Sequence, residues 1–123
     1  MKQKNTLVIG ASENPERYSN KAIRLLNYFK HPVFALGIKT GEVDGIKISK
    51  DLEPKHFPEI DTITLYIGPK NQTPYFNFIT TIHPKRVIFN PGTENQELTD
   101  FLDKKNIAWE EACTLVLLNT NQY

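Results

Sequence analysis

Cysteine, net charge and long apolar runs are all scarce in this chain, and each scarcity excludes a class of protein. Cys113 is the single cysteine, so no disulfide can form within the chain. The 15 basic and 14 acidic residues leave a net charge of +1, which argues against nucleic acid or an anionic membrane as partners held by an overall field. No apolar run approaches the roughly 20 residues of a membrane span. With no signal-like start, we expect a reducing, cytoplasmic location.

Short apolar runs alternate with segments of helical periodicity, and the length of 123 residues suits one domain, 1–123. Five strands are predicted, at residues 7–9, 33–36, 62–67, 86–89 and 107–109. Because these runs are apolar throughout, they predict a mostly parallel five-stranded sheet with helices on both faces, a three-layer Rossmann-like α/β fold. We expect the strand order 3-2-1-4-5, with ligands bound beyond the carboxyl ends of the first and fourth strands.

Apolar residues spaced three and four apart predict the helices between these strands. The first helix ends before Pro32, the second is expected to be capped by Thr73, and the third by Thr93. The segment 40–60 is expected to be irregular, with a short strand at 46–48 or a single helical turn. A short helix is expected within the tail that follows the last strand.

The first strand runs into Gly10, Ala11 and Ser12, and then through a polar loop into a helix. This is not the dinucleotide fingerprint G-x-G-x-x-G, because Ser12 and Pro15 stand where the later glycines would be. Free N–H groups and the helix dipole attract anions to a helix N-terminus. The helix after Thr93 begins with acidic residues, whereas the first helix is preceded by Arg17. We therefore predict that phosphates bind at the first loop and helix, although a plain capped turn is the simpler alternative.

Three further segments are candidates for the rest of a nucleotide site. Lys39 is the first charged residue after the second strand, where NAD-binding domains place an acid. A cation there suits a phosphorylated ribose, as in coenzyme A (CoA) or NADP, unless it is an ordinary solvated lysine. The segment 67–69 offers an apolar wall for adenine or a pantetheine arm, and 90–92 either lines the cleft or only begins a helix.

Residues with catalytic potential form no convincing constellation. His31, His56 and His83 each lie beside or near a proline, and we expect them at the surface. No histidines or carboxylates have metal-ligand spacing. Cys113 is flanked by apolar residues, which predicts a buried, inert thiol.

Four segments, taken in order, resemble the small CoA-binding domain family, which is related to the N-terminal domain of the succinyl-CoA synthetase alpha subunit. They are residues 8–22, 45–47, 90–95 and 112–116. The resemblance implies a Rossmann-like fold that holds CoA, with its phosphates on the first loop and helix. The synthetase's catalytic histidine belongs to a second domain that this chain lacks, so ligase activity is not implied. The candidate CoA-binding residues are Gly10, Ala11, Ser12, Asn14, Arg17, Tyr18, Ser19, Lys21, Lys39, Gly68, Pro69, Asn90, Pro91 and Gly92.

These observations together predict a stand-alone protein that binds CoA or acyl-CoA and has no catalytic machinery of its own. One alternative is an NAD(P)-binding redox-sensing module, with NADP as its ligand. The other is a small acyl-CoA or thiol-dependent enzyme that uses Cys113. The expected partner is a small nucleotide, neither nucleic acid nor membrane, and a homodimer or an unknown protein partner stays open.

Overall fold

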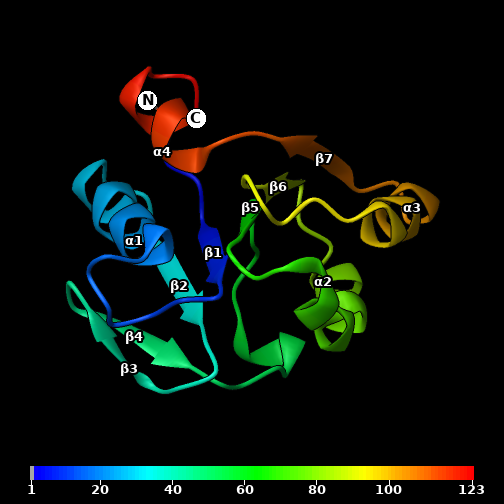
Figure 1. The fold of residues 1–123 in the computed structure, drawn as a ribbon, viewed down its shortest axis with the longest axis horizontal. Helices are drawn as coiled ribbons and strands as arrows, with labels where there is room; N and C mark the ends of the chain where they lie inside the picture. The colour runs from blue at the N-terminus through cyan, green and yellow to red at the C-terminus, as the bar shows by residue number, and fades with distance from the viewer. Residues whose placement is uncertain (1) are drawn as a thin grey trace.

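Seven strands form one sheet in the computed structural model, which describes residues 2–123 (Figure 1). They are β1 (Thr6–Ile9), β2 (Val33–Leu36), β3 (Gly41–Val43), β4 (Ile46–Ser49), β5 (Thr62–Leu65), β6 (Arg86–Phe89) and β7 (Ala108–Glu111). Their order is β3-β4-β2-β1-β5-β6-β7, and only β3 runs antiparallel to its neighbour.

Helices cover both faces of this sheet, as the sequence predicted. The helices are α1 (Tyr18–Tyr28), α2 (Phe76–Ile82), α3 (Gln96–Lys104) and α4 (Thr114–Asn119), with 3-10 turns at Pro54–His56, Pro69–Asn71 and Thr73–Tyr75. In Figure 1, α1 and α4 lie on one side of the sheet and α2 and α3 on the other. No helix in the described part of the chain is long and apolar enough to cross a membrane.

The central strands are buried on both faces because each contributes apolar side chains to two cores. Leu7 and Ile9 pack with the α2 and α3 side chains, whereas Val8 between them packs with α1 and α4. All three are 0% exposed. Burial of one such side chain contributes roughly 1.5–3 kcal/mol, which explains why the strands read as continuous apolar runs rather than alternating ones.

The predicted strand count and order were wrong in detail. β5, expected at the edge, pairs with β1 in the middle of the sheet, so β1 and β5 flank the point where the order reverses, not the first and fourth predicted strands. The threonines of β5 are tolerated there because their hydroxyls are bonded. Thr64 Oγ1 lies 2.8 Å from Thr114 Oγ1 and accepts from Asn90 Nδ2 at 2.6 Å.

The short strand expected at 46–48 is present as β4 (Ile46–Ser49), and the difference is that β3 pairs with it as an antiparallel hairpin within the segment expected to be irregular. Asp44 and Gly45 join the two strands with φ angles of 52° and 83°. Positive φ at both central residues is typical of tight hairpin turns, and Asp-Gly is a favoured sequence for them. The hairpin extends the sheet beyond β2 and begins directly after Lys39 and Thr40, which brings it next to the site.

The predicted cap of the second helix was also wrong. Thr73 starts a 3-10 turn and makes no capping hydrogen bond, and α2 begins only at Phe76. Pro74 in that turn fixes a backbone that suits a helix start, but the first turn is tighter than an α-helix.

Candidate functional site

A cleft of about 1080 Å³ lies at the carboxyl ends of the central parallel strands. It is formed by segments within residues 10–19, 38–40, 66–75 and 91–93, with Leu52 added from a more distant loop. Parallel α/β sheets bind ligands at this edge, where the strand order reverses. The volume is slightly above the usual range for small-molecule and cofactor sites, roughly 300–1,000 Å³, which suits a large ligand.

The loop from β1 to α1 is fixed tightly against its neighbours. Gly10 has a φ of 97°, and a Cβ there would lie 2.9 Å from the backbone of Tyr66. The N–H groups of Gly10 and Ala11 both donate to the carbonyl of Leu36. The buried Asn20 side chain donates to the carbonyl of Ser12 at 2.9 Å. The loop that faces the ligand space is therefore ordered before any ligand arrives.

The N-terminus of α1 opens into this cleft without a side-chain cap. Arg17 occupies the N-cap position and makes no capping hydrogen bond, and the first turn has no acidic residue. The next N–H groups, of Tyr18 and Ser19, find no acceptor among residues 2–123. Unpaired N–H groups and the positive end of the dipole make such a terminus a site for an anion.

The N-terminus of α3, the competing anion site, is closed. Its cap is Asn95, not the predicted Thr93: Asn95 Oδ1 accepts from the N–H groups of Glu97 at 3.1 Å and Leu98 at 3.4 Å. Thr93 instead donates its hydroxyl to the carbonyl of Asn90. Glu97 also places a negative charge in the first turn. This arrangement favours α1 as the place for phosphates.

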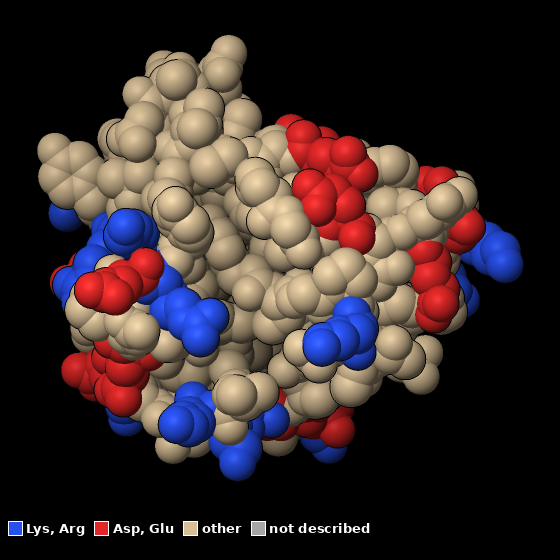
Figure 2. Space-filling view, in the orientation of Figure 1, with Lys and Arg blue, Asp and Glu red and all other residues tan. Residues whose placement is uncertain are grey.

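Cations surround the cleft without acidic partners. Arg17, Lys39 and Lys70 line it, and none forms an ion pair among the described residues, where the pairs are His56–Asp51 and Arg86–Glu110. Figure 2 shows basic side chains on several sides of a central hollow, with acidic side chains at the upper right and also among the basic ones at the left and the bottom. Free cations around an open helix N-terminus give the cleft a preference for anionic ligands.

Apolar side chains are exposed at the same cleft. Tyr18, Ile38 and Leu52 line it while being 67%, 80% and 40% exposed. The described residues hold only three other large apolar side chains with comparable exposure. Grouped apolar exposure rimmed by polar residues is typical of a binding site. The ligand that fits this cleft is thus partly anionic and partly apolar.

Most of the residues predicted from the sequence come together here. The exceptions, which do not line the cleft, are Asn14, Lys21, Pro69 and Asn90. Asn14 accepts from the N–H of Glu16, Lys21 lies over the ring of Tyr18 at 5.2 Å, and Pro69 begins a 3-10 turn.

Asn90 has a structural explanation of its own. It is 2% exposed, donates to Thr64 and to the carbonyl of Leu65, and accepts from the N–H of Thr114 at 2.9 Å. The residue thereby joins β5, β6 and the start of α4 beneath the cleft.

Sequence reasoning missed several cleft residues, among them Ile38, Leu52, Tyr66, Lys70 and Tyr75. Tyr66 directly follows β5, and its buried hydroxyl has no hydrogen-bond partner among the described residues. Burial raises the pKa of this hydroxyl, which keeps it protonated. The position of Tyr66 at the end of a predicted strand could have pointed to the cleft. The other missed residues lie in loops whose paths depend on tertiary packing.

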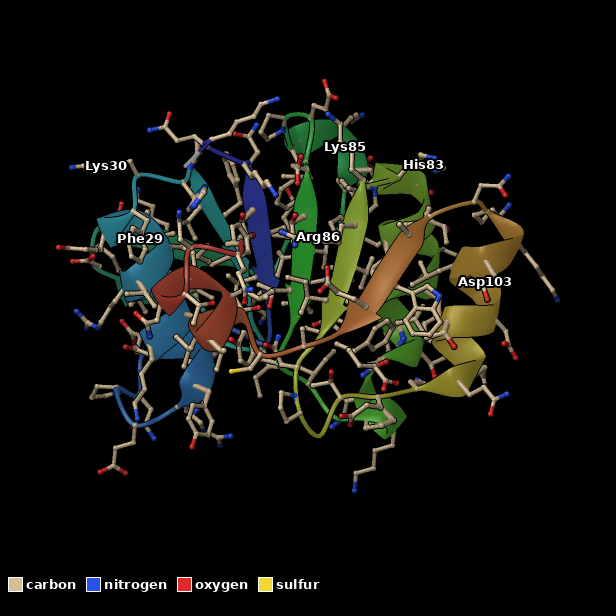
Figure 3. All side chains as sticks on the ribbon, turned by 90° about the horizontal axis from the view of Figure 1, so that it is seen from above. Phe29, Lys30, His83, Lys85, Arg86 and Asp103 are labelled. Atoms are coloured by element: carbon tan, nitrogen blue, oxygen red, sulfur yellow. The ribbon has the colours of Figure 1, made fainter. Side chains whose placement is uncertain are left out.

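The predicted surface position of His31 was wrong. His31 is 2% exposed and its Nδ1 accepts from the N–H of Lys4 at 3.0 Å. Desolvation, followed by the positive charge of Lys4, lowers its pKa. Figure 3 shows that Lys30, His83 and Lys85 lie at the end of the sheet opposite the cleft loops, the same end as His31.

Cys113 is partly exposed at the start of α4 and not fully buried as predicted. It does not line the cleft, and neither does any histidine. No group of three or more potential metal ligands occurs within residues 2–123.

The fold and this cleft define a Rossmann-like α/β domain, in which a helix N-terminus faces the reversal point of a mostly parallel sheet. Comparison gives the family: the chain matches the CoA binding domain over residues 4–119 and belongs to that family. No curated protein matches it.

Several solved structures share this fold. A crystal structure of an uncharacterized protein is 40% identical and covers 100% of both chains, with a TM-score of 0.95. A conserved hypothetical protein from Pyrococcus furiosus is 26% identical over 94% of this chain and 98% of its own, with a TM-score of 0.80. The dinucleotide-forming acetyl-coenzyme A synthetase 1 of Ca. Korarchaeum cryptofilum, solved with phosphate and ADP, is 17% identical. It aligns with 86% of this chain and 25% of its own, with a TM-score of 0.71, and shows the fold alone.

Proposed function

We propose that this protein binds CoA or an acyl-CoA, with the diphosphate at the N-terminus of α1. The observation that carries the proposal is that open terminus: the N–H groups of Tyr18 and Ser19 have no acceptor among the described residues, and Arg17 stands beside them. Each charge-assisted hydrogen bond to a phosphate contributes roughly 1.5–3 kcal/mol. Membership of the CoA binding domain family supports a CoA-type ligand.

The ribose end of the ligand is assigned to the loop after β2. Lys39 lines the cleft there and forms no ion pair within the described part of the chain. A lone ammonium in this position suits the 3′-phosphate of CoA, whereas an acidic residue would suit the unmodified ribose of NAD. The exposed side chains of Ile38 and Leu52 beside it provide an apolar surface for the adenine ring.

The pantetheine arm is assigned to the wall formed by the loops after β5 and β6. Ile67, Gly68, Pro91 and Gly92 line this part of the cleft, and a Cβ at Gly68 or Gly92 would meet nothing within 4 Å. A slender, weakly polar chain fits such an open wall. The proposal concerns binding, and the histidines and Cys113 lie outside the cleft lining.

Isothermal calorimetry of ligand-stripped protein tests this function. CoA is titrated first, followed by NADP and NAD under the same salt conditions. We expect a saturable heat for CoA and a much weaker one for NADP and NAD. Tighter binding of NADP than of CoA would overturn the proposal in favour of the redox-module alternative, and binding of none of the three would show that the cleft serves another ligand.

A further inference from the structure

Two acidic residues, Glu13 and Glu16, also line this cleft, and Glu13 makes a contact that links two of its loops. Glu13 belongs to the loop between β1 and α1 and lines the cleft together with Arg17 and Lys39. A carboxylate there repels phosphate, so its presence calls for a reason. The structure gives one: Glu13 Oε2 accepts a hydrogen bond from the N–H of Glu42 in β3 at 2.9 Å. Glu13 therefore joins the phosphate-facing loop to the edge hairpin.

The Glu13 side chain packs into space that is open only because residue 41 is a glycine. A Cβ at Gly41 would lie 2.4 Å from Cδ of Glu13, closer than any real contact allows. Gly41 does not need a left-handed backbone, since its φ lies outside that range. Its missing side chain thus serves to admit Glu13 against the start of β3.

The contact fixes the segment that carries Lys39. At one end of the segment, a Cβ on Gly37 would lie 2.6 Å from the carbonyl oxygen of Ala11, so the two loops are in close contact there. At the other end, Glu13 occupies the space beside Gly41. Lys39 lies midway between these two attachments, and its ammonium has no ion pair of its own among residues 2–123.

We propose that Glu13 is a positioning residue that holds the loop 37–41 so that Lys39 reads the ribose phosphate of the ligand. This inference rests on the proposed binding of CoA. It assigns to Glu13 a role in specificity: without the contact, Lys39 is free to leave the cleft, and the preference for a 3′-phosphorylated nucleotide falls. The unfavourable charge of Glu13 is offset by the ordering that it imposes on its cationic neighbour.

The measurement is the ratio of the affinities for CoA and dephospho-CoA, which lacks the 3′-phosphate. The wild-type protein is expected to prefer CoA by roughly tenfold or more, the contribution of one charge-assisted bond. Lys39→Ala gives the reference value of this affinity ratio for a protein that no longer contacts the 3′-phosphate. Glu13→Ala and Gly41→Ala are expected to lower the affinity ratio toward that of Lys39→Ala. The first removes the carboxylate, and the second adds a methyl group that displaces the Glu13 side chain.

Two variants serve as matched controls. Glu13→Gln keeps an oxygen that accepts from the Glu42 N–H, so it should retain the wild-type ratio. Glu42→Ala removes a nearby negative charge but keeps the backbone donor, and should also retain it. Circular dichroism and thermal melting establish that each variant is folded before the ratio is measured.

The outcomes separate this inference from the function on which it rests. Loss of the ratio in Glu13→Ala and Gly41→Ala, with both controls unchanged, supports it. An equal loss of affinity for both ligands in Glu13→Ala would overturn it, because the residue would then act only on the loop as a whole. Wild-type binding of CoA without preference over dephospho-CoA would also overturn it while leaving CoA binding intact. Failure of CoA to bind at all would instead contradict the proposed function.

Discussion

The N-termini of α1 and α3 lie at the same edge of the sheet and carry the same kind of dipole, yet one is open and the other closed. At α3, the side chain of Asn95 accepts from two N–H groups and Glu97 neutralises the first turn. At α1, Arg17 in the equivalent position caps nothing, and no acid follows it. The α3 terminus is capped by its own side chains, whereas the α1 terminus leaves N–H donors that water or a ligand can satisfy.

The difference shows that a helix N-terminus becomes an anion site through the residues around it rather than through its dipole alone. A cap such as Asn95 stabilises a protein by about 1 kcal/mol. α1 forgoes this contribution and keeps two N–H groups for the cleft. Its loop is held by other means, including the Asn20 bond to the carbonyl of Ser12 and the bond from Arg24 to Asn20. These bonds in the loop before α1 offset the stability that α1 loses by having no cap.

Closing the α1 terminus should have the largest effect. Arg17→Asp gives α1 an acidic cap like those that finish ordinary helices. We expect CoA affinity to fall on the order of 100-fold or more, because a charge-assisted bond is lost and a repulsive charge is introduced. The free energy of unfolding without ligand should rise by about 1 kcal/mol. Calorimetry and urea denaturation measure the two effects, and unchanged affinity would move the phosphates away from α1.

Opening the α3 terminus should produce the opposite pattern with a smaller effect. Asn95→Ala removes the cap and the bond from Asn95 to the Gln72 side chain. The free energy of unfolding is expected to fall by roughly 0.5–2 kcal/mol, while CoA affinity stays the same. If this variant weakens CoA binding as much as it weakens the fold, the two termini are not functionally distinct.

Acidification should weaken the fold through a group remote from both termini, and the effect is expected to be the smallest. The lowered pKa of His31 means that the folded protein binds fewer protons than the unfolded chain as pH falls below the ordinary value of 6.5. Its contribution to stability is complete above that pH and is lost on acidification. Lys4 and Arg86 oppose its protonation, and Asp61 favours it.

Denaturation between about pH 5.5 and 7.5 measures this loss in the range where histidine titrates. His31→Gln is the comparison, and its stability should change less with pH over that range. A steeper dependence in His31→Gln than in the wild-type protein would contradict this account. Loss of CoA binding in His31→Gln, with the fold intact, would show that the far end of the sheet takes part in the site.

The layers of the fold were predictable, whereas the neighbours within the sheet were not. Continuous apolar runs such as 7–9 and 86–89 indicate a buried parallel strand, but nothing in them states which strand lies beside which. The central place of β5 depends on distant residues that satisfy its buried hydroxyls: Asn90 and Thr114 bond Thr64, and Arg86 donates to Thr62. For the β3–β4 hairpin, Asp44-Gly45 indicated the turn and a short strand was expected after it, whereas the three-residue β3 before it is too short to leave a periodic signal.

The same distinction applies to the cleft. Ser12 and Lys39 were found because they come soon after strands whose ends meet at one edge, and Arg17 because it precedes the first helix. Leu52 comes from a loop whose path depends on tertiary contacts, so no periodicity or motif marks it. Thr93 and Asn95 are both acceptable caps by residue type. The helix begins after Asn95, whose amide also donates to Gln72.

The central claim is that the open terminus of α1, and not the capped terminus of α3, holds the phosphates of CoA. Backbone amide shifts of isotope-labelled protein during a CoA titration test it most directly. The account predicts that the amides of Ser12, Tyr18 and Ser19 shift strongly while those of Glu97 and Leu98 stay in place. Strong shifts at Glu97 and Leu98, with Tyr18 and Ser19 unmoved, would contradict it.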